Sequence, residues 1–599
     1  MSTAVMPDLS EKAAPLRRQE CFFWLCAAAA VLVFLGRNSL FGAESFAVEA
    51  AREAAEWGNW LTLGVNGAPF PRLPVLETWS IAAAFSGFGV SEFAARLPSA
   101  LAVLVLLAGV RALAGSLFDR RTALLAGWLT LGSYGFLYLG RSVAGGVPGC
   151  AAVVWAVAWY CRGDGRPTFL RFFVFHLLVA LGVWAGGGFY LLMPAVFLLP
   201  GTWRGRRGAE IFSPKSIAAL LPAAAIAAAW PVFAFRSELL RLFDRAVALL
   251  SSSSGWAELG ALLLRNITAR RSDPVYAGSY EVLRVMLPWA AVLLSSLVGM
   301  FSRFRALSAE TRSLLYGALL LFLFCAVPPS ARWTDFLPLV PFLSVITAAG
   351  LLDCGREEWN VWAVAATRSV LVVLAALGAV SPVALPVWRQ LFKTELPVVV
   401  LLTLPVMGAA VLLIMILDSY PTRPLGRLTG LPERLGSTVL GGTLITICLI
   451  SLVVPALREM RYEKPFFLSL RPVFAELEPD SVIFAGSRSN SAVMLFYTGL
   501  KKPCTVVSDG DLAGFGEAVA RRAGKHLAIV TRYREKRELE FLRRGAAAAG
   551  LKLDVKAPDH LEKSPQGYGA NDRRRACWLV TAPAANEKGK TTILEHKDK

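Results

Sequence analysis

The sequence has little charge and few of the residue types that soluble enzymes use for catalysis. Only 18% of its 599 residues are charged, whereas about 25% is usual for a soluble globular protein. It contains 4 His and 9 Cys, with no CxxC pair and no Cys/His spacing typical of a metal centre. No GxxxxGK[ST] or HExxH motif occurs, and no GxSxG lies on a strand–helix turn. The corresponding nucleotide-binding and hydrolytic sites are therefore excluded.

Long apolar runs dominate the sequence. Hydrophobic residues make up 55% of the chain, and they gather in blocks of about 20 residues, the length that crosses the hydrocarbon core of a bilayer. This composition excludes a soluble, a disordered and a fibrous protein, so we predict a polytopic α-helical membrane protein. Thirteen spans are predicted, near 21–36, 98–114, 122–140, 147–161, 172–184, 187–201, 216–235, 284–301, 313–328, 336–353, 369–387, 396–417 and 435–457. The run 172–201 also fits one long helix that is broken at Gly186–Gly188.

The net charge of +19 follows the predicted topology. Most Lys and Arg residues fall in the loops on one side, whereas the short loops on the other side hold only Arg141, Arg332, Arg389 and Lys393. Basic loops stay in the cytoplasm, so we predict a multi-pass protein of the bacterial inner membrane with a cytoplasmic N-terminus. The basic residues then serve membrane orientation, and we expect no nucleic-acid partner.

Two polar segments between spans are predicted to lie on the outer side. The first, 37–97, contains two predicted helices, Glu44–Trp57 and Leu76–Phe88, joined by a Gly/Pro-rich turn over Gly64–Pro74. The second is 236–283. Long loops in compact proteins are usually functional, so we expect the site in these segments.

The composition becomes that of a soluble domain near the C-terminus. The runs SVIFAG, CTVVS, HLAIVT, KLDVKAP and ACWLVTA predict strands, and helical patterns near Asn490–Leu500, Leu512–Gly524 and Glu535–Gly550 alternate with them. We therefore divide the chain into a cytoplasmic N-terminus (1–20), a transmembrane domain that includes both outer loops (21–457), a periplasmic α/β domain (458–583) and a flexible tail (584–599).

The first outer loop carries a series of short motifs. In chain order they are Glu44-Ser-Phe, EAARE (Glu49–Glu53), GNW (Gly58–Trp60), NG (Asn66–Gly67), FPRLPVLETW (Phe70–Trp79) and ARLPSA (Ala95–Ala100). YLGRS (Tyr138–Ser142), MLPW (Met286–Trp289) and FLPLVPFLSVITAAG (Phe336–Gly350) follow. This order resembles the GT-C glycosyltransferases, and more narrowly the group of the aminoarabinose lipid A transferases and protein O-mannosyltransferases. The thirteen spans and the trailing α/β domain are similar to that layout too.

The resemblance implies a membrane glycosyltransferase of the cell envelope. It would take a sugar from a polyprenyl-phosphate carrier and pass it, with inversion, to a lipid, glycan or protein acceptor on the outer side, as in lipid A or polysaccharide modification. An anionic phosphate leaving group calls for Arg or Lys donors. The acceptor needs a carboxylate that takes its proton or orients it.

The resemblance also suggests site residues. Glu44 matches an acidic position of the family and is the candidate catalytic residue, as base or as orienting carboxylate. The candidate substrate-binding residues are Arg72, Arg141 and Arg332, as phosphate ligands, and Glu77 beside the turn. Two family acids are replaced, by Ala43 and by Arg72 itself. A divalent metal is compatible with the resemblance, but no metal ligand is assigned.

The replaced acids motivate a second hypothesis, a non-catalytic relative that binds lipid and acts as a partner in envelope glycan assembly. Each site residue also has a plainer interpretation. Glu44 would favour the start of a helix, Glu77 would lie on a helix surface, and the arginines would reach toward lipid headgroups. A transporter is disfavoured, because it would place ionisable groups at mid-membrane, whereas Arg111 and Arg368 lie near span ends.

Overall fold

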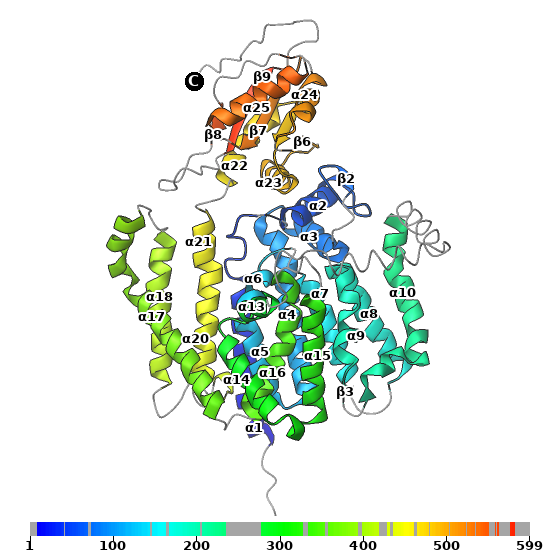
Figure 1. Ribbon diagram of the computed structural model, residues 1–599, viewed down its shortest axis with the longest axis vertical. Coiled ribbons are helices and arrows are strands. Elements are labelled where there is room, and N and C mark those ends of the chain that lie inside the picture. The colour runs from blue at the N-terminus through cyan, green and yellow to red at the C-terminus, as the bar shows by residue number, and fades with distance from the viewer. Residues whose placement is uncertain are drawn as a thin grey trace, which may run out of the picture.

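A computed structural model shows a helical bundle, a thin layer of loop helices above it and an α/β domain on top (Figure 1). It describes residues 9–581 except 41, 43, 70–73, 144–145, 163–166, 204–205, 235–276, 327–332, 354–357, 393–397, 419–427, 432–434, 460–463, 479, 502, 509, 523, 533–534, 550, 552–557, 559 and 562–574. Most of the predicted loop 236–283 and the predicted tail 584–599 lie outside the described residues.

The bundle consists of long apolar helices. These are α1 (Leu9–Leu32), α4 (Glu92–Leu117), α5 (Arg120–Gly132), α6 (Tyr134–Gly140), α7 (Val147–Cys161), α8 (Phe169–Gly186), α9 (Met193–Leu198), α10 (Pro214–Ala234), α13 (Ala277–Val285), α14 (Ala290–Ser302), α15 (Ala309–Ala326), α16 (Leu339–Asp353), α17 (Glu358–Phe392), α18 (Val398–Leu417), α20 (Leu435–Cys448) and α21 (Val454–Glu459), with η5 (Leu449–Val453) between the last two. Each of the thirteen predicted spans overlaps at least one of them.

Six helices in the described part of the chain are long and apolar enough to cross a membrane, or up to eight spans if each bent pair counts as one. Four further apolar helices are shorter than a full span. The chain is therefore a membrane protein with many apolar helices, and the count of thirteen spans stays a prediction.

Three breaks interrupt the bundle helices. α5 and α6 meet at 67°, and α13 and α14 meet at 114°. These two breaks lie against each other, because the Tyr134 amide donates to the Leu287 carbonyl over 2.7 Å. The break predicted at Gly186–Gly188 is confirmed: α8 ends at Gly186, Gly187 has a φ of 92°, and a short 3-10 helix, η1 (Gly188–Leu191), follows.

The first outer loop forms the layer above the bundle. Helices α2 (Glu44–Trp57) and α3 (Val75–Phe88) flank a hairpin of two very short strands, β1 (Gly64–Val65) and β2 (Ala68–Pro69). The predicted bounds of α2 are confirmed, and α3 begins one residue before the prediction. Figure 1 shows this layer between the bundle and the α/β domain.

The α/β domain has one mixed sheet with the strand order β6-β5-β7-β9-β8. The strands are β5 (Val482–Ala485), β6 (Thr505–Val507), β7 (His526–Arg532), β8 (His560–Leu561) and β9 (Arg575–Thr581). β5, β6 and β7 are parallel, and β9 pairs antiparallel with β7 and β8. The helices of the domain are α22 (Lys464–Glu476), α23 (Arg488–Thr498), α24 (Leu512–Ala520) and α25 (Glu535–Ala548).

Four of the five predicted strands and all three predicted helices of this domain are therefore confirmed. The fifth predicted strand, in KLDVKAP, falls largely on residues 552–557, outside the described part. One apolar core joins the domain to the first outer loop. It contains Val48 and Phe85 of the loop together with Phe467, Phe484 and Met494 of the domain. We call it the shared core.

Candidate functional site

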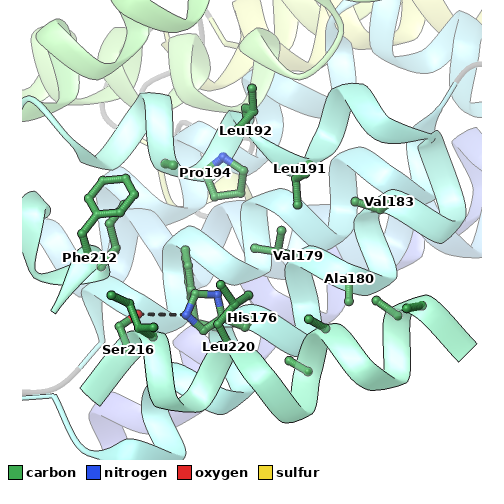
Figure 2. A pocket seen from close by; sticks show the side chains of 18 residues that line it. His176, Val179, Ala180, Val183, Leu191, Leu192, Pro194, Phe212, Ser216 and Leu220 are labelled. Atoms are coloured by element: carbon green, nitrogen blue, oxygen red, sulfur yellow. Dashed lines mark hydrogen bonds between the residues drawn. The ribbon is translucent and has the colours of Figure 1, made fainter. Parts of the chain in front are cut away.

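An apolar cavity of about 480 Å³ lies between α8, α9 and α10 (Figure 2). Its wall includes Val179, Ala180, Val183, Leu191 and Ala224. The only polar pair on the wall among the described residues is His176 and Ser216, whose side chains form a 2.9 Å hydrogen bond. Such a cavity suits an apolar chain and offers little to a sugar or a phosphate.

The predicted polar residues that the structure describes, Glu44, Glu77 and Arg141, lie elsewhere, on α2, on α3 and at the end of α6. Glu44, the first residue of α2, is buried and forms an ion pair with Arg96 of α4. The guanidinium donates from Nε to Oε1 over 2.8 Å and from NH2 to Oε2 over 3.1 Å. The Val143 amide donates a third bond to Oε1, over 3.1 Å. Glu44 therefore ties the start of α2 to two bundle segments.

Arg141 ends α6 close to this ion pair and is also buried. Its guanidinium donates to the carbonyls of Ala30, Val31 and Val33, over 2.7–2.9 Å. The last carbonyls of a helix have no partner within it, so Arg141 completes the end of α1. Burial, and next the charge of Arg96, lower the pKa of Arg141 to about 10.

Glu77 lies in the first turn of α3 and is buried. The Ser99 hydroxyl of α4 donates to its Oε1 over 3.3 Å. Glu77 and Asp335 both lie near enough to the Tyr190 hydroxyl of η1 to act on it electrostatically. That hydroxyl donates to the Gly146 carbonyl over 2.9 Å. Glu77 of α3 and Asp335 of the 3-10 helix η4 (Trp333–Phe336) thus form, with Tyr190, a second polar group that is connected electrostatically.

Arg72 and Arg332, the other two predicted phosphate ligands, lie outside the described residues. In the sequence each of them directly precedes a part of this second group. Arg72 stands five residues before Glu77, and Arg332 stands three residues before Asp335.

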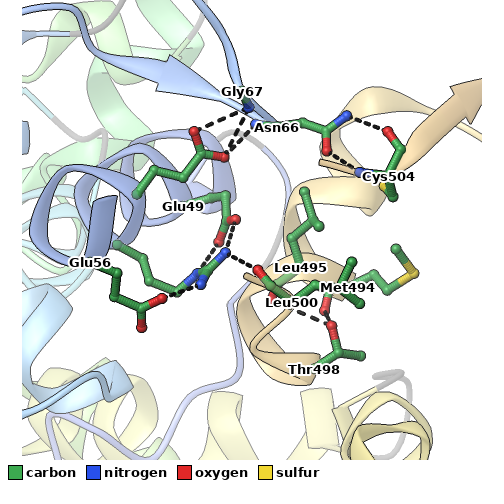
Figure 3. A network of polar contacts seen from close by, with 11 residues as sticks. Glu49, Glu56, Asn66, Gly67, Met494, Leu495, Thr498, Leu500 and Cys504 are labelled. Carbon is green, nitrogen blue, oxygen red and sulfur yellow. Dashed lines mark hydrogen bonds and ion pairs between the residues drawn. The ribbon is translucent and has the colours of Figure 1, made fainter. Parts of the chain in front are cut away.

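A third polar network lies between α2 and the α/β domain (Figure 3). Arg52 donates to both oxygens of Glu49, to Glu56 and to the Leu500 carbonyl, over 2.6–2.9 Å. Glu53 accepts from the amides of Asn66, over 2.5 Å, and Gly67, over 3.2 Å. This network connects the EAARE and NG motifs to each other and to the domain.

The network holds two of its acidic groups, Glu49 and Glu53, away from water. Burial, followed by the neighbouring charge of Glu49, raises the pKa of Glu53 to about 7, although the two turn amides and Arg52 act against the shift. Burial also raises the pKa of Glu49, against the effect of Arg52. Glu53 is therefore a carboxyl group that titrates near neutral pH.

Sequence reasoning missed the partners of the predicted residues. Arg96 and Ser99 both belong to the ARLPSA motif, and they bind Glu44 and Glu77 respectively. The signal was available, because residues three apart lie on one side of a helix. Through these two residues, the motif at the start of α4 therefore binds both α2 and α3.

The described residues do not fit a metal centre. Within the ranges that the structure describes, no group of three or more His, Cys, Asp or Glu residues could hold a metal ion. Both oxygens of Glu44 already accept bonds from a guanidinium, which takes the place a cation would need. We derive no step through a metal.

Comparisons with known proteins show which family and which solved structures this chain is similar to. Residues 72–203 match the family described as dolichyl-phosphate-mannose-protein mannosyltransferase. No curated protein matches the sequence. Among solved structures, ArnT from Cupriavidus metallidurans is similar in its apo state and bound to undecaprenyl phosphate. The TM-scores are 0.63 and 0.62, with 17% identity, and each match covers 95% of this chain and 99% of the other.

The two findings agree with the motif order in the sequence. The family match contains Glu77, Arg96 and Arg141, and the structural match extends over the bundle, the loop layer and the α/β domain. The chain therefore has the GT-C glycosyltransferase fold, and its resemblance to the ArnT and protein mannosyltransferase group is confirmed.

Proposed function

We propose that this chain is a membrane glycosyltransferase that moves a sugar from a polyprenyl-phosphate carrier to a lipid, glycan or protein acceptor. The observation that carries this proposal is a buried polar layer. Carboxylates and arginines of the first outer loop lie between the apolar helices of the bundle and the α/β domain that covers them. A buried layer excludes the water that would otherwise hydrolyse the donor. We place this layer on the periplasmic side of the bacterial inner membrane.

The reaction needs a base, a phosphate ligand and a place for an apolar tail. The acceptor hydroxyl attacks the anomeric carbon, the bond from that carbon to the phosphate oxygen breaks, and polyprenyl phosphate leaves. The hydroxyl proton passes to a carboxylate. The cavity beside Ala180 supports the proposal, because it could receive part of the apolar tail of the carrier.

Glu44 and Glu77 take different parts in this proposal. Both oxygens of Glu44 are held by Arg96, so we assign Glu44 the orienting role at the start of α2. Glu77 is the carboxylate that we assign to the acceptor proton, because it lies in the group with Tyr190 and Asp335. Arg72 and Arg332 remain the proposed phosphate ligands, and Arg141 supports the end of α1.

The test is donor turnover by the purified full chain in lipid nanodiscs. Polyprenyl-phosphate sugars are supplied, and release of polyprenyl phosphate is measured with and without membrane acceptors. We expect Glu77→Gln to lower kcat at least about 100-fold, the scale of general-base loss, while the thermal midpoint stays within a few degrees. Ser80→Ala, on the same helix, is the matched control, since its hydroxyl donates to the Glu77 carbonyl within that helix. Equal turnover by Glu77→Gln and the wild type would remove Glu77 from the mechanism.

One observation favours the alternative, a lipid-binding partner without catalysis. Glu44 and Arg141, two of the three predicted residues that the structure describes, are bound to the chain's own groups. In that case the purified chain would bind polyprenyl phosphate and release none from any sugar donor. Transfer or donor hydrolysis by the wild type would exclude this alternative.

A further inference from the structure

Besides the contact of Arg52 in α2 with Leu500, the α/β domain bonds to the first outer loop at three places far apart in the loop. Before α2, the Leu40 amide donates to the Tyr497 hydroxyl over 2.8 Å. At the hairpin, Asn66 bonds to Cys504. At the start of α4, Glu92 accepts from Tyr497 and pairs with Lys464. A contact at a single place would leave the loop free to tilt, whereas three contacts determine its position.

The middle contact is a two-bond clasp. The Asn66 side chain donates from Nδ2 to the Cys504 carbonyl over 2.7 Å, and its Oδ1 accepts from the Cys504 amide over 2.8 Å (Figure 3). An amide side chain thus pairs with a backbone unit in the manner of a neighbouring strand. The clasp uses the donor and the acceptor of Cys504 together, so no other side chain type of this length could replace Asn66 in full.

The turn is shaped to present this clasp. Asn66 and Gly67 have φ values of 58° and 71°, the left-handed region that Asn-Gly hairpin turns adopt. A Cβ atom on Gly67 would lie 2.6 Å from the Pro503 side chain. The domain therefore packs directly on the turn, and only glycine fits there.

The clasp is connected to α2 by charged side chains. Glu53 holds the two amides of the turn, and Arg52, one residue earlier, reaches the Leu500 carbonyl of the domain over 2.9 Å. Arg52 and Glu53 are each 1% exposed. Separation of the domain would break the Arg52 bond to the Leu500 carbonyl and expose the apolar side chains of the shared core to water, so the domain and α2 move together.

α2 begins at Glu44, which is bound to the same α4 motif that binds Glu77. Any tilt of α2 is thereby transmitted to the group that we assign to the reaction. We propose that the α/β domain positions the first outer loop for transfer, and that Asn66 and Arg52 are the positioning residues that carry this coupling. This inference rests on the proposed function above.

The test uses the full chain with Asn66→Gly, which keeps the left-handed turn and removes the clasp. Two quantities are measured: hydrogen exchange of the amides in 44–69, and the kcat and donor KM of transfer. We expect exchange to rise in 44–69 and kcat to fall about tenfold, while the donor KM changes less than twofold. The matched control is Thr498→Val, since the Thr498 hydroxyl bonds only within its own helix, and we expect wild-type values.

The outcomes separate this inference from the proposed function. Faster exchange with unchanged kcat would overturn the positioning role, and so would unchanged values of both. If the wild type transfers no sugar, the proposed function fails. Hydrogen exchange of the amides in 44–69 then tests the inference without transfer, and unchanged exchange in Asn66→Gly overturns it. Should Asn66→Gly fail to fold, Tyr497→Phe breaks the contacts at Leu40 and Glu92 instead, with an expected threefold loss of kcat.

Discussion

The two ends of the bundle use ion pairs in different ways. At the end covered by the α/β domain, Glu44 and Arg96 are 3% and 1% exposed. At the opposite end, Glu20 of α1 pairs with Arg111 and Arg120, and the side chains of Glu20 and Arg120 are 28% and 55% exposed. Both ion pairs satisfy their charges, but Glu44 and Arg96 are removed from water whereas Glu20 and Arg120 stay partly exposed.

The difference has an energetic meaning. An exposed ion pair contributes about 0–1 kcal/mol, because water solvates each partner nearly as well. A buried pair gives little net stability but is costly to break, because the remaining charge has no solvent. The Glu44–Arg96 pair therefore holds its geometry more strictly than the Glu20 pairs do.

The largest effect is expected from a substitution that breaks the buried ion pair of Glu44 and Arg96. Glu44→Ala leaves Arg96 charged and buried, so we expect a loss of about 3–5 kcal/mol of stability and a sharp fall in expression of folded protein. Glu20→Ala is the matched change at the exposed end, with an expected loss of about 1 kcal/mol or less. Thermal unfolding in detergent measures both. Equal losses would contradict the comparison.

A pH titration tests the effect of burial at a second site, the network of Arg52 and Glu53 between α2 and the α/β domain. The folded-state pKa of Glu53, about 7, lies above the ordinary value of 4.5. Its protonated form therefore favours the folded state. The resulting stability is fully present below pH 4.5 and is lost as the pH rises through 7, a change on the order of 3–4 kcal/mol at about 1.4 kcal/mol per pKa unit. Glu53→Gln should flatten this dependence, measured as unfolding midpoints between pH 4.5 and 8. A slope that survives in the variant would assign the effect to another group, such as Glu49.

Arg141 tests whether a buried arginine at the covered end serves structure or substrate. Lys cannot reproduce a fork that reaches three carbonyls, so Arg141→Lys should cost about 1–2 kcal/mol of stability, from lost hydrogen bonds. If Arg141 only completes α1, the donor KM will not change. A KM that rises tenfold or more, with wild-type stability, would make it a phosphate ligand.

The smallest expected effect concerns the apolar cavity. Ala180→Trp fills part of the space between α8 and α10, so a long carrier tail should bind less well. We expect the KM for a long-chain donor to rise about fivefold, roughly 1 kcal/mol, and the KM for a short-chain analogue to stay constant. The exposed Leu181→Trp change is the control. Equal effects on both donors would exclude the cavity as the tail site.

Local features of the fold were predictable from the sequence. The helix Glu44–Trp57 was predicted with the observed bounds because its polar and apolar residues alternate with helical period, and a Gly-containing segment follows it. The break at Gly186–Gly188 follows from the three consecutive glycines. Apolar length likewise indicated the bundle helices, although length alone does not separate a full span from a shorter buried helix.

Long-range partners were not predictable. Arg96 lies 52 residues from Glu44, and Cys504 lies 438 residues from Asn66, so no periodicity connects them. Reading the motifs one by one assigned Glu44 and Arg141 to substrate. Their hydrogen bonds to other parts of the chain could be identified only from the folded structure. In the sequence, several arginines are equally suitable partners for each carboxylate.

The shared core also has a consequence for the order of synthesis. Its loop half is made early, and its domain half follows more than 400 residues later, since Leu40 and Tyr497 are 457 positions apart. At about 5–20 residues per second, roughly 20–90 s separate the two. During that interval the loop stands exposed and incomplete. The shared core is therefore completed only after the α/β domain has been translated.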